Sequence, residues 1–203
     1  GIRDWSVTGV QTCALPIWNP AELLFVPRDA ERPEHTAMTR EEVLKCFAAL
    51  EQRERLIAKF AVLAGLRPGE IFGLKWGHLE ETHAHIRQRV YRGEIDSPKT
   101  SNSIRKAALS AGLIEEINRW REISLDPSPD AWVFASETGK TPLSRDNVWR
   151  RRIGPNLKAV GLGWVDFHVM RRTHSTLMNE IHDDPKLVAD QLGHTIEIGR
   201  AHV

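Results

Sequence analysis

The residues best suited to chemistry are a histidine and two arginines in the C-terminal third of the chain. His168 and Arg171 stand three residues apart, so on a helix they would share one face, about 60° apart. A guanidinium can bind two oxygens of one phosphate, and an imidazole can transfer a proton near neutral pH. Arg172, four residues from His168, meets the same condition, so spacing alone leaves both arginines as candidates. A surface histidine beside surface arginines is the alternative interpretation.

Two shorter segments carry further candidates. The sequence GLRPGE, residues 65–70, places Arg67 between a glycine that can end one helix and Pro68, which suits the first turn of the next. Such a turn would aim the side chain of Arg67, and Glu70 could pair with it and fix it. An ordinary corner between two helices is the alternative. His194, in the sequence LGH at a predicted helix end, could serve a site or satisfy free carbonyls.

Basic residues are unevenly distributed, although the formal net charge is only +1. Residues 140–172 hold eight Lys or Arg against two Asp, and residues 87–106 hold six against two acidic residues. Concentrated positive charge is typical of proteins that bind the phosphate backbone of DNA. Solvated surfaces without a ligand are the alternative. The candidate DNA-binding residues are Arg145, Arg150, Arg151, Arg152 and Arg172.

Several other classes of protein lack support in the sequence. It contains no CxxC pair and no HExxH, GxGxxG, GxxxxGK[ST] or GxSxG motif, so we expect neither a metal nor a cofactor. Two cysteines are too few for a disulfide framework and favour a reducing compartment. No apolar run approaches the roughly 18 residues of a membrane span. We therefore expect a cytoplasmic, nucleoid-associated protein that does not contact a membrane.

The elements that would position the candidates are mostly helices. Thr39 and Glu42 form a capping-box pattern, which predicts a helix with Val43, Leu44, Phe47 and Leu50 on one side. Residues 83–92 and 103–109 are predicted antiparallel strands, joined by a turn. Further helices are predicted over residues 55–64, from Pro68, over 113–120, from Ser144 to about 159, over 167–181 and over 185–192. The prediction is an α+β fold, mainly α, with a small antiparallel β-sheet.

The order of the motifs resembles that of the tyrosine recombinase (phage integrase) family. Arg67 in GLRPGE, Lys99 in the turn SPKT, the pair His168 and Arg171, and His194 in LGH follow one another in the order typical of that family's catalytic domain. The resemblance covers about residues 36–195, and residues 19–28 are similar to the linker that precedes the domain. It implies an integrase-type catalytic fold.

The resemblance also implies a role for each residue. Arg67 and Arg171 would hold the non-bridging oxygens of the scissile phosphate, with Glu70 supporting Arg67. Lys99 would protonate the leaving 5′ oxygen, His168 would act as acid and base, and His194 would donate a hydrogen bond to the phosphate. Cations positioned in this way can stabilise phosphoryl transfer without a metal.

One departure from the family concerns its nucleophile. A tyrosine normally follows LGH by about nine residues, but position 203 is valine, and the single tyrosine, Tyr91, matches no family motif. Residues 1–17 and 198–203 resemble translated sequencing adapters. We therefore expect four segments: a non-native 1–17, an interdomain linker at 18–35 that ends a lost core-binding domain, a C-terminally truncated catalytic domain at 36–197, and a non-native 198–203.

Two functions remain in competition at this point. The first is a fragment of a site-specific recombinase, which cleaves and rejoins DNA through a 3′-phosphotyrosine intermediate in the intact parent. Its partners would be double-stranded DNA and other recombinase protomers, as a tetrameric synapse, while this chain would itself be inactive. The second is a non-catalytic DNA-binding regulator that uses the basic helix from Ser144 as a recognition element. A general phosphodiesterase or nuclease would need a metal site or a second acid–base pair, and the sequence offers neither.

Overall fold

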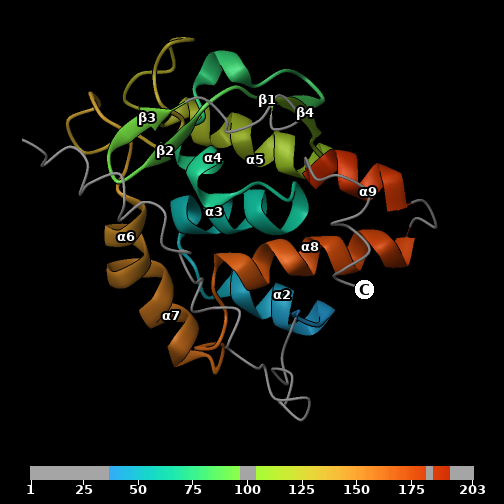
Figure 1. Cartoon of the computed structure of the whole chain (residues 1–203). Coiled ribbons are helices and arrows are strands. Elements are labelled where there is room, and N and C mark those ends of the chain that lie inside the picture. The colour runs from blue at the N-terminus through green and yellow to red at the C-terminus, as the bar shows by residue number, and fades with distance from the viewer. Residues whose placement is uncertain (1–36, 97–103, 182–184, 193–203) are drawn as a thin grey trace, which may run out of the picture. The chain divides into compact units, whose positions relative to one another are not determined.

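The central element of the fold is the helix α3, Gln52–Leu63. The structure is a computed structural model of the 203-residue chain, and it describes residues 37–96, 104–181 and 185–192. In Figure 1, α3 lies between α2 (Arg40–Ala48) and α8 (Phe167–Ile181) on one side and α4 (Pro68–Phe72) and α5 (Ala111–Glu122) on the other, and it contacts all four. Nearly every turn of α3 therefore carries buried residues, as its mostly apolar sequence requires.

The helix α2 begins with the capping box that the sequence predicts. The hydroxyl of Thr39 accepts from the backbone N–H of Glu42 at 3.2 Å, and the Glu42 carboxylate accepts from the backbone N–H of Thr39 at 2.8 Å. Val43 and Phe47 are buried, but Leu44 is 62% exposed, so its placement on the apolar side was wrong. Leu44 follows Val43 directly and is therefore rotated by about 100° from the buried stripe.

The turn between α3 and α4 depends on Gly65. This residue has φ +63°, the left-handed conformation that favours glycine. A Cβ atom at this position would lie 2.5 Å from Cδ2 of His174 in α8. Arg67 follows as the N-terminal flanking residue of α4, and Pro68 occupies the first turn, as predicted.

The strands form two separate antiparallel pairs. β1 (His83–Ile86) pairs with β4 (Arg105–Ala108), and β2 (Arg89–Tyr91) pairs with β3 (Glu94–Asp96). The predicted single strand over residues 83–92 is thus broken at residues 87 and 88. The break lets β2 pack directly on α4, where Gly69 and Gly73 have no side chains to separate the two backbones. Gln88 at the break donates to the carbonyl of Gly73 at 2.7 Å.

The predicted basic helix after Ser144 consists of three consecutive stretches. They are α6 (Arg145–Val148), the π-helical segment η4 (Trp149–Ile153) and α7 (Gly154–Ala159). The Ser144 hydroxyl caps the first by accepting from Asn147 at 3.4 Å. The helix α9 (Pro185–Leu192) contacts α8 and β4, and a short 3-10 turn, η2 (Trp76–His78), precedes β1.

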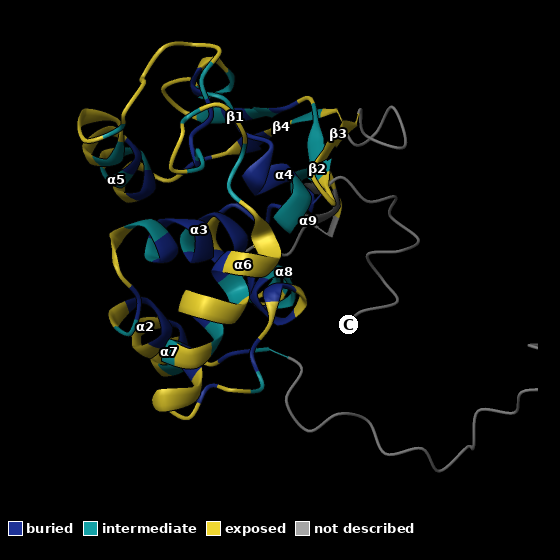
Figure 2. Cartoon of the chain, turned by 90° about the vertical axis from the view of Figure 1, so that its left-hand side faces the viewer, coloured by how far each residue is buried: buried dark blue, intermediate teal, exposed yellow. Residues whose placement is uncertain are grey.

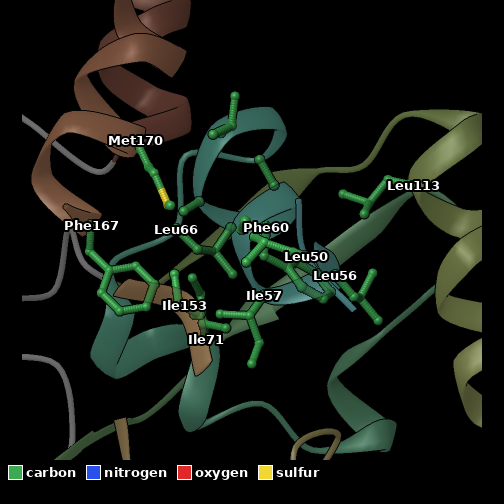
Figure 3. Packing of buried hydrophobic residues seen from close by; sticks show 14 of the residues in the cluster. Leu50, Leu56, Ile57, Phe60, Leu66, Ile71, Leu113, Ile153, Phe167 and Met170 are labelled. Atoms are coloured by element: carbon green, nitrogen blue, oxygen red, sulfur yellow. The ribbon is translucent and has the colours of Figure 1, made fainter. Parts of the chain in front are cut away.

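The hydrophobic core joins residues from all of the larger helices. Figure 3 shows side chains of α3, α4, η4 and α8 in one cluster, among them Phe60, Ile71, Ile153, Phe167 and Met170. In Figure 2, α3 is mostly buried, whereas α6 and α7 expose much of their surface. The structure confirms a mainly α fold with small antiparallel pairs. Within the described ranges, no helix is long and apolar enough to cross a membrane.

Candidate functional site

A buried carboxylate is the centre of the candidate site. Glu70 in α4 is 5% exposed, and its two oxygens accept from Nη1 and Nη2 of Arg105 in β4, both at 3.0 Å. Glu70 also accepts from Nη1 of Arg67 at 2.9 Å and from the Arg67 backbone N–H at 2.8 Å. Burial by itself would raise the pKa of Glu70, but the hydrogen bonds and charges of Arg105 and Arg67 outweigh it and lower the pKa. The carboxylate is therefore ionised at neutral pH.

Arg67 is held by this carboxylate but remains accessible. The sequence predicts a pair between Arg67 and Glu70, and the structure confirms it. Arg67 precedes the short helix α4, so its backbone is fixed by the first turn of that helix. Its side chain is 37% exposed, in contrast to 7% for Arg105. Arg67 can therefore bind a ligand from solvent, while Arg105 is occupied by protein groups.

Arg171 on α8 joins two other parts of the chain. Its Nη1 donates to the carbonyl of Gly65, and its Nη2 donates to the carbonyl of Leu192 at 2.5 Å. Burial, together with the charges of Arg67 and Arg105, lowers the pKa of Arg171 to about 9, although the charge of Glu70 opposes this. Arg171 is still a cation at pH 7. It shares its electrostatic surroundings with Arg67, although about 100 residues separate them in the sequence.

The site carries more positive than negative charge. We use the term arginine cluster for Arg67, Arg105 and Arg171 around the single carboxylate of Glu70. Within the described part of the chain, three guanidinium groups lie around this one carboxylate, in a partly buried location. Guanidinium groups gathered in this way repel one another, and a bound anion reduces that repulsion. The arrangement therefore suits an anion with several oxygens, such as a phosphate.

His174 is a member of the site that the sequence analysis missed. It lies three residues after Arg171 on α8, is 1% exposed, and its Nδ1 lies 2.9 Å from the carbonyl oxygen of Val62. Burial is the main reason that its pKa falls to about 4, and the charges of Arg171 and Arg105 add to this effect. The neutral ring therefore fixes the end of α3. In the sequence, the only indication that His174 belongs to the site is its position three residues after Arg171, on the same face of the predicted helix.

Arg105 was also missed, although it had been counted among the basic residues of the hairpin. A strand has a period of two residues, so Arg105 shares a face with Ala107, which is fully buried. An arginine on a buried face requires a carboxylate partner. That reasoning identifies Arg105 as a buried ion-pair residue.

The other predicted site residues lie in different parts of the chain. His168 lies one turn before Arg171 on α8, and its side chain is exposed. Among the described residues, His168 is not one of the groups that bond to the arginine cluster. Lys99 and His194 lie outside the described residues, as do the segments 1–17 and 198–203 and the expected linker at 18–35.

The basic helix α6–α7 presents its arginines to solvent. Arg145, Arg150, Arg151 and Arg152 are all exposed, whereas Arg172 on α8 is half-buried. Arg145 pairs with the exposed Asp146 at 2.8 Å, and Arg152 lies 3.9 Å from the exposed Glu51. Exposed pairs of this kind contribute little and are easily exchanged for other anions.

Metal chemistry has no candidate in the described part of the chain. No group of three or more His, Cys, Asp or Glu residues is placed there to hold a metal ion. Cys46 is buried in the core, and burial raises the pKa of its thiol to about 12.

Comparisons with known proteins agree on one family. The sequence model of the "Phage integrase family" matches residues 36–197. The ICEBs1 integrase of Bacillus subtilis is 26% identical, over 96% of this chain and 59% of that protein. A "Tyrosine recombinase XerC-like" protein of Caldanaerobacter subterraneus is 28% identical, over 83% of this chain and 50% of that protein. The chain thus spans between half and three-fifths of the length of these relatives.

Solved structures show the same fold at lower identity. The Tn1549 transposon integrase, in complex with circular intermediate DNA, has a TM-score of 0.76 at 18% identity, covering 97% of this chain and 70% of that one. The XerA recombinase has a TM-score of 0.67 at 21% identity, covering 90% and 65%. A lambda integrase dimer bound to a COC' core site has a TM-score of 0.57 at 20% identity, covering 85% and 60%.

Proposed function

The chain belongs to the phage integrase family, and from this premise we propose that its arginine cluster binds the scissile phosphate of double-stranded DNA in site-specific recombination. The observation that carries the proposal is the gathering of Arg67, Arg105 and Arg171 around the buried Glu70. A phosphodiester offers two non-bridging oxygens, and its charge grows as phosphoryl transfer proceeds. Fixed cations stabilise that charge without having to reorganise.

The two arginines that matter most reach the phosphate from different elements. Arg67 is fixed by the turn before α4 and by Glu70, and it keeps a third of its surface exposed. Arg171 is held by the carbonyls of Gly65 and Leu192, which fix the direction of its guanidinium group. We assign the non-bridging oxygens to these two side chains. Arg105, which is buried against Glu70, supports them.

The remaining steps follow the resemblance to the family. A tyrosyl oxygen attacks phosphorus, the bond from phosphorus to the 5′ oxygen breaks, and a 3′-phosphotyrosine forms. We propose that Lys99 protonates the leaving oxygen, that His168 exchanges the proton of the nucleophile, and that His194 donates to the phosphate. The exposed imidazole of His168, one turn from Arg171, is compatible with that role.

We further propose that this 203-residue chain binds DNA without cleaving it. Its single tyrosine, Tyr91, lies in β2, and its ring is 5.3 Å from the guanidinium carbon of Arg92. Its neighbours among the described residues, Glu94 and Arg92, are not members of the arginine cluster. Recombination would thus require a protein in which a tyrosine reaches the arginine cluster.

The DNA duplex would also be bound by the exposed arginines of α6–α7 and by Arg172. The related integrases were solved with DNA, and the lambda integrase was solved as a dimer on its core site. We therefore propose DNA as the partner, with other protomers of the same protein bound beside it. A role in a mobile element is consistent with the relationship to the ICEBs1 and Tn1549 integrases.

The test measures binding of a labelled DNA duplex to the wild-type chain and to R67A and R171A. Each variant should lose about fivefold to tenfold in affinity and flatten the salt dependence by about one phosphate contact. The control is R119A, because Arg119 is an exposed arginine on α5 that pairs only loosely with Glu115. Equal affinities for R67A, R171A and R119A would overturn the proposal. In that case a regulator that binds through α6–α7 would be favoured.

A further inference from the structure

The side chain of Gln191 forms an unusual connection between α9 and β4. Its Oε1 accepts from the backbone N–H of Ala108 at 3.0 Å, and its Nε2 donates to the carbonyl of Ala108 at 3.2 Å. Nε2 also donates to the carbonyl of Ala64 at 3.3 Å. One planar amide thus satisfies both backbone groups of Ala108 and reaches the end of α3. We call this set of contacts the Gln191 clasp.

The backbone at the same place holds two members of the arginine cluster. The carbonyl of Gln191 accepts from Nε of Arg105 at 2.9 Å, and the carbonyl of Leu192 accepts from Nη2 of Arg171 at 2.5 Å. The last carbonyls of a helix have no partner within the helix and carry partial negative charge. They therefore attract guanidinium groups, and here each of them contributes one hydrogen bond to the orientation of Arg105 or Arg171.

We propose that Gln191 is a positioning residue of the phosphate site, acting through Arg105 and Arg171. The clasp fixes the end of α9, and the carbonyls of Gln191 and Leu192 then orient Arg105 and Arg171 together with Glu70 and the carbonyl of Gly65. This inference rests on the proposed function of the arginine cluster. It assigns a role to a residue that would not itself touch DNA.

The chemistry of the clasp explains why glutamine is required. A donor and an acceptor must lie on one rigid group, at the length that reaches both Ala108 and Ala64. Glutamate provides no donor for the two carbonyls, asparagine is one methylene shorter, and methionine has a similar length but forms no comparable hydrogen bonds. Q191M therefore removes the contacts with little change in volume, and Q191N repeats the test with a shorter amide.

The experiment is a double-mutant cycle on the full chain, with a labelled DNA duplex as the probe. If Gln191 positions Arg171, Q191M should weaken binding about fivefold in the wild-type background but less than twofold in the R171A background. A residue that only stabilises the fold would cost the same factor in both backgrounds. The control is D190E, because Asp190 is the exposed neighbour of Gln191, and it should bind like the wild type.

A second measurement on the protein without DNA separates the two proposals. Amide hydrogen exchange at Ala108 and the guanidinium N–H signals of Arg171 should lose protection in Q191M and Q191N, while D190E leaves both unchanged. Additive losses of affinity, wild-type affinity in Q191M, or unchanged Arg171 signals would overturn the positioning role. A different outcome is that the wild-type chain does not bind the duplex, while Q191M still loses the protection of the Arg171 N–H signals. That outcome would contradict the proposed phosphate binding but support the positioning of Arg171 by Gln191.

Discussion

The ring of His174 lies directly against the backbone of Gly65, at a position where a Cβ atom on residue 65 would be 2.5 Å away. The same ring approaches the carbonyl of Val62 through Nδ1, and the carbonyl of Gly65 accepts from Arg171. The turn that precedes Arg67 therefore packs against α8 at Gly65, where there is no side chain to separate the backbone from the ring of His174. Changes on either side of this contact should affect both the fold and the site.

Substitution of Gly65 by alanine should destabilise the protein strongly. The left-handed conformation costs a residue with a Cβ roughly 1–2 kcal/mol, and the clashes with His174 and with Cδ2 of Leu192 add to that cost. The matched control is G161A, because Gly161 has φ +79° but nothing within 4 Å of the added Cβ. Urea unfolding should show a clearly larger loss for G65A than for G161A. Equal losses would mean that the close packing of His174 and Leu192 on Gly65 contributes nothing.

The buried neutral His174 should make stability depend on pH. Its pKa is about 4 in the folded protein and about 6.5 when unfolded, so the unfolded state binds the proton more readily. Folding should therefore lose stability as the pH falls from 6.5 to 4, by up to about 3 kcal/mol at the lower limit. Above pH 6.5 the effect should vanish. Unfolding curves of wild type and H174N between pH 7.5 and 4.5 measure it, and parallel pH dependences would contradict the assignment.

The carboxylate of Glu70 should also make stability depend on pH, but in a lower range of pH than His174. Its folded pKa lies below the ordinary 4.5, so the stability it contributes is complete above pH 4.5 and is lost as the pH falls through the folded value. At pH 7, E70Q leaves the buried Arg105 without its carboxylate and should cost about 3 kcal/mol or more. The difference in unfolding free energy between E70Q and the wild type should shrink below pH 4.5. A difference in unfolding free energy that stays constant over this pH range would show that the charge of Glu70 does not contribute to stability.

The sequence predicts the elements of this fold better than it predicts their contacts. Capping at Thr39, the glycine stop at Gly65 and the apolar period of α8 are local signals, and each of them gave the correct element. The break between β1 and β2 is imposed by packing on α4, which no local pattern records. Arg105 enters the site because of a carboxylate 35 residues away. Contacts at that separation cannot be inferred from spacing within a motif.

Binding of duplex DNA should depend on salt through the exposed arginines of α6–α7. Replacing Arg150, Arg151 and Arg152 by glutamine should weaken binding to all sequences to a similar degree. The slope of log affinity against log salt should fall by about 0.9 for each phosphate contact that is lost. The measurement is a titration with two unrelated duplexes at several salt concentrations. Sequence-selective loss of affinity, without a change in slope, would indicate base recognition instead.

The last prediction is that this chain forms no covalent adduct with DNA. Covalent catalysis requires a nucleophile that can reach the phosphorus, and the guanidinium groups of the site are cationic and cannot attack. A neutral histidine would give only an unstable adduct. Tyr91 belongs to β2, where it pairs with Glu94 across the hairpin and contacts Arg92.

The measurement is incubation with a nicked duplex, followed by denaturation and a search for a protein–DNA adduct. Y91F is the control, because it removes the only tyrosine of the chain. We expect neither protein to form an adduct and both to bind the duplex with the same affinity. An adduct on the wild-type chain that Y91F abolishes would make Tyr91 the nucleophile. An adduct on both chains would mean that another side chain attacks the phosphate, and the roles proposed for the arginine cluster and His168 would then have to be reassigned.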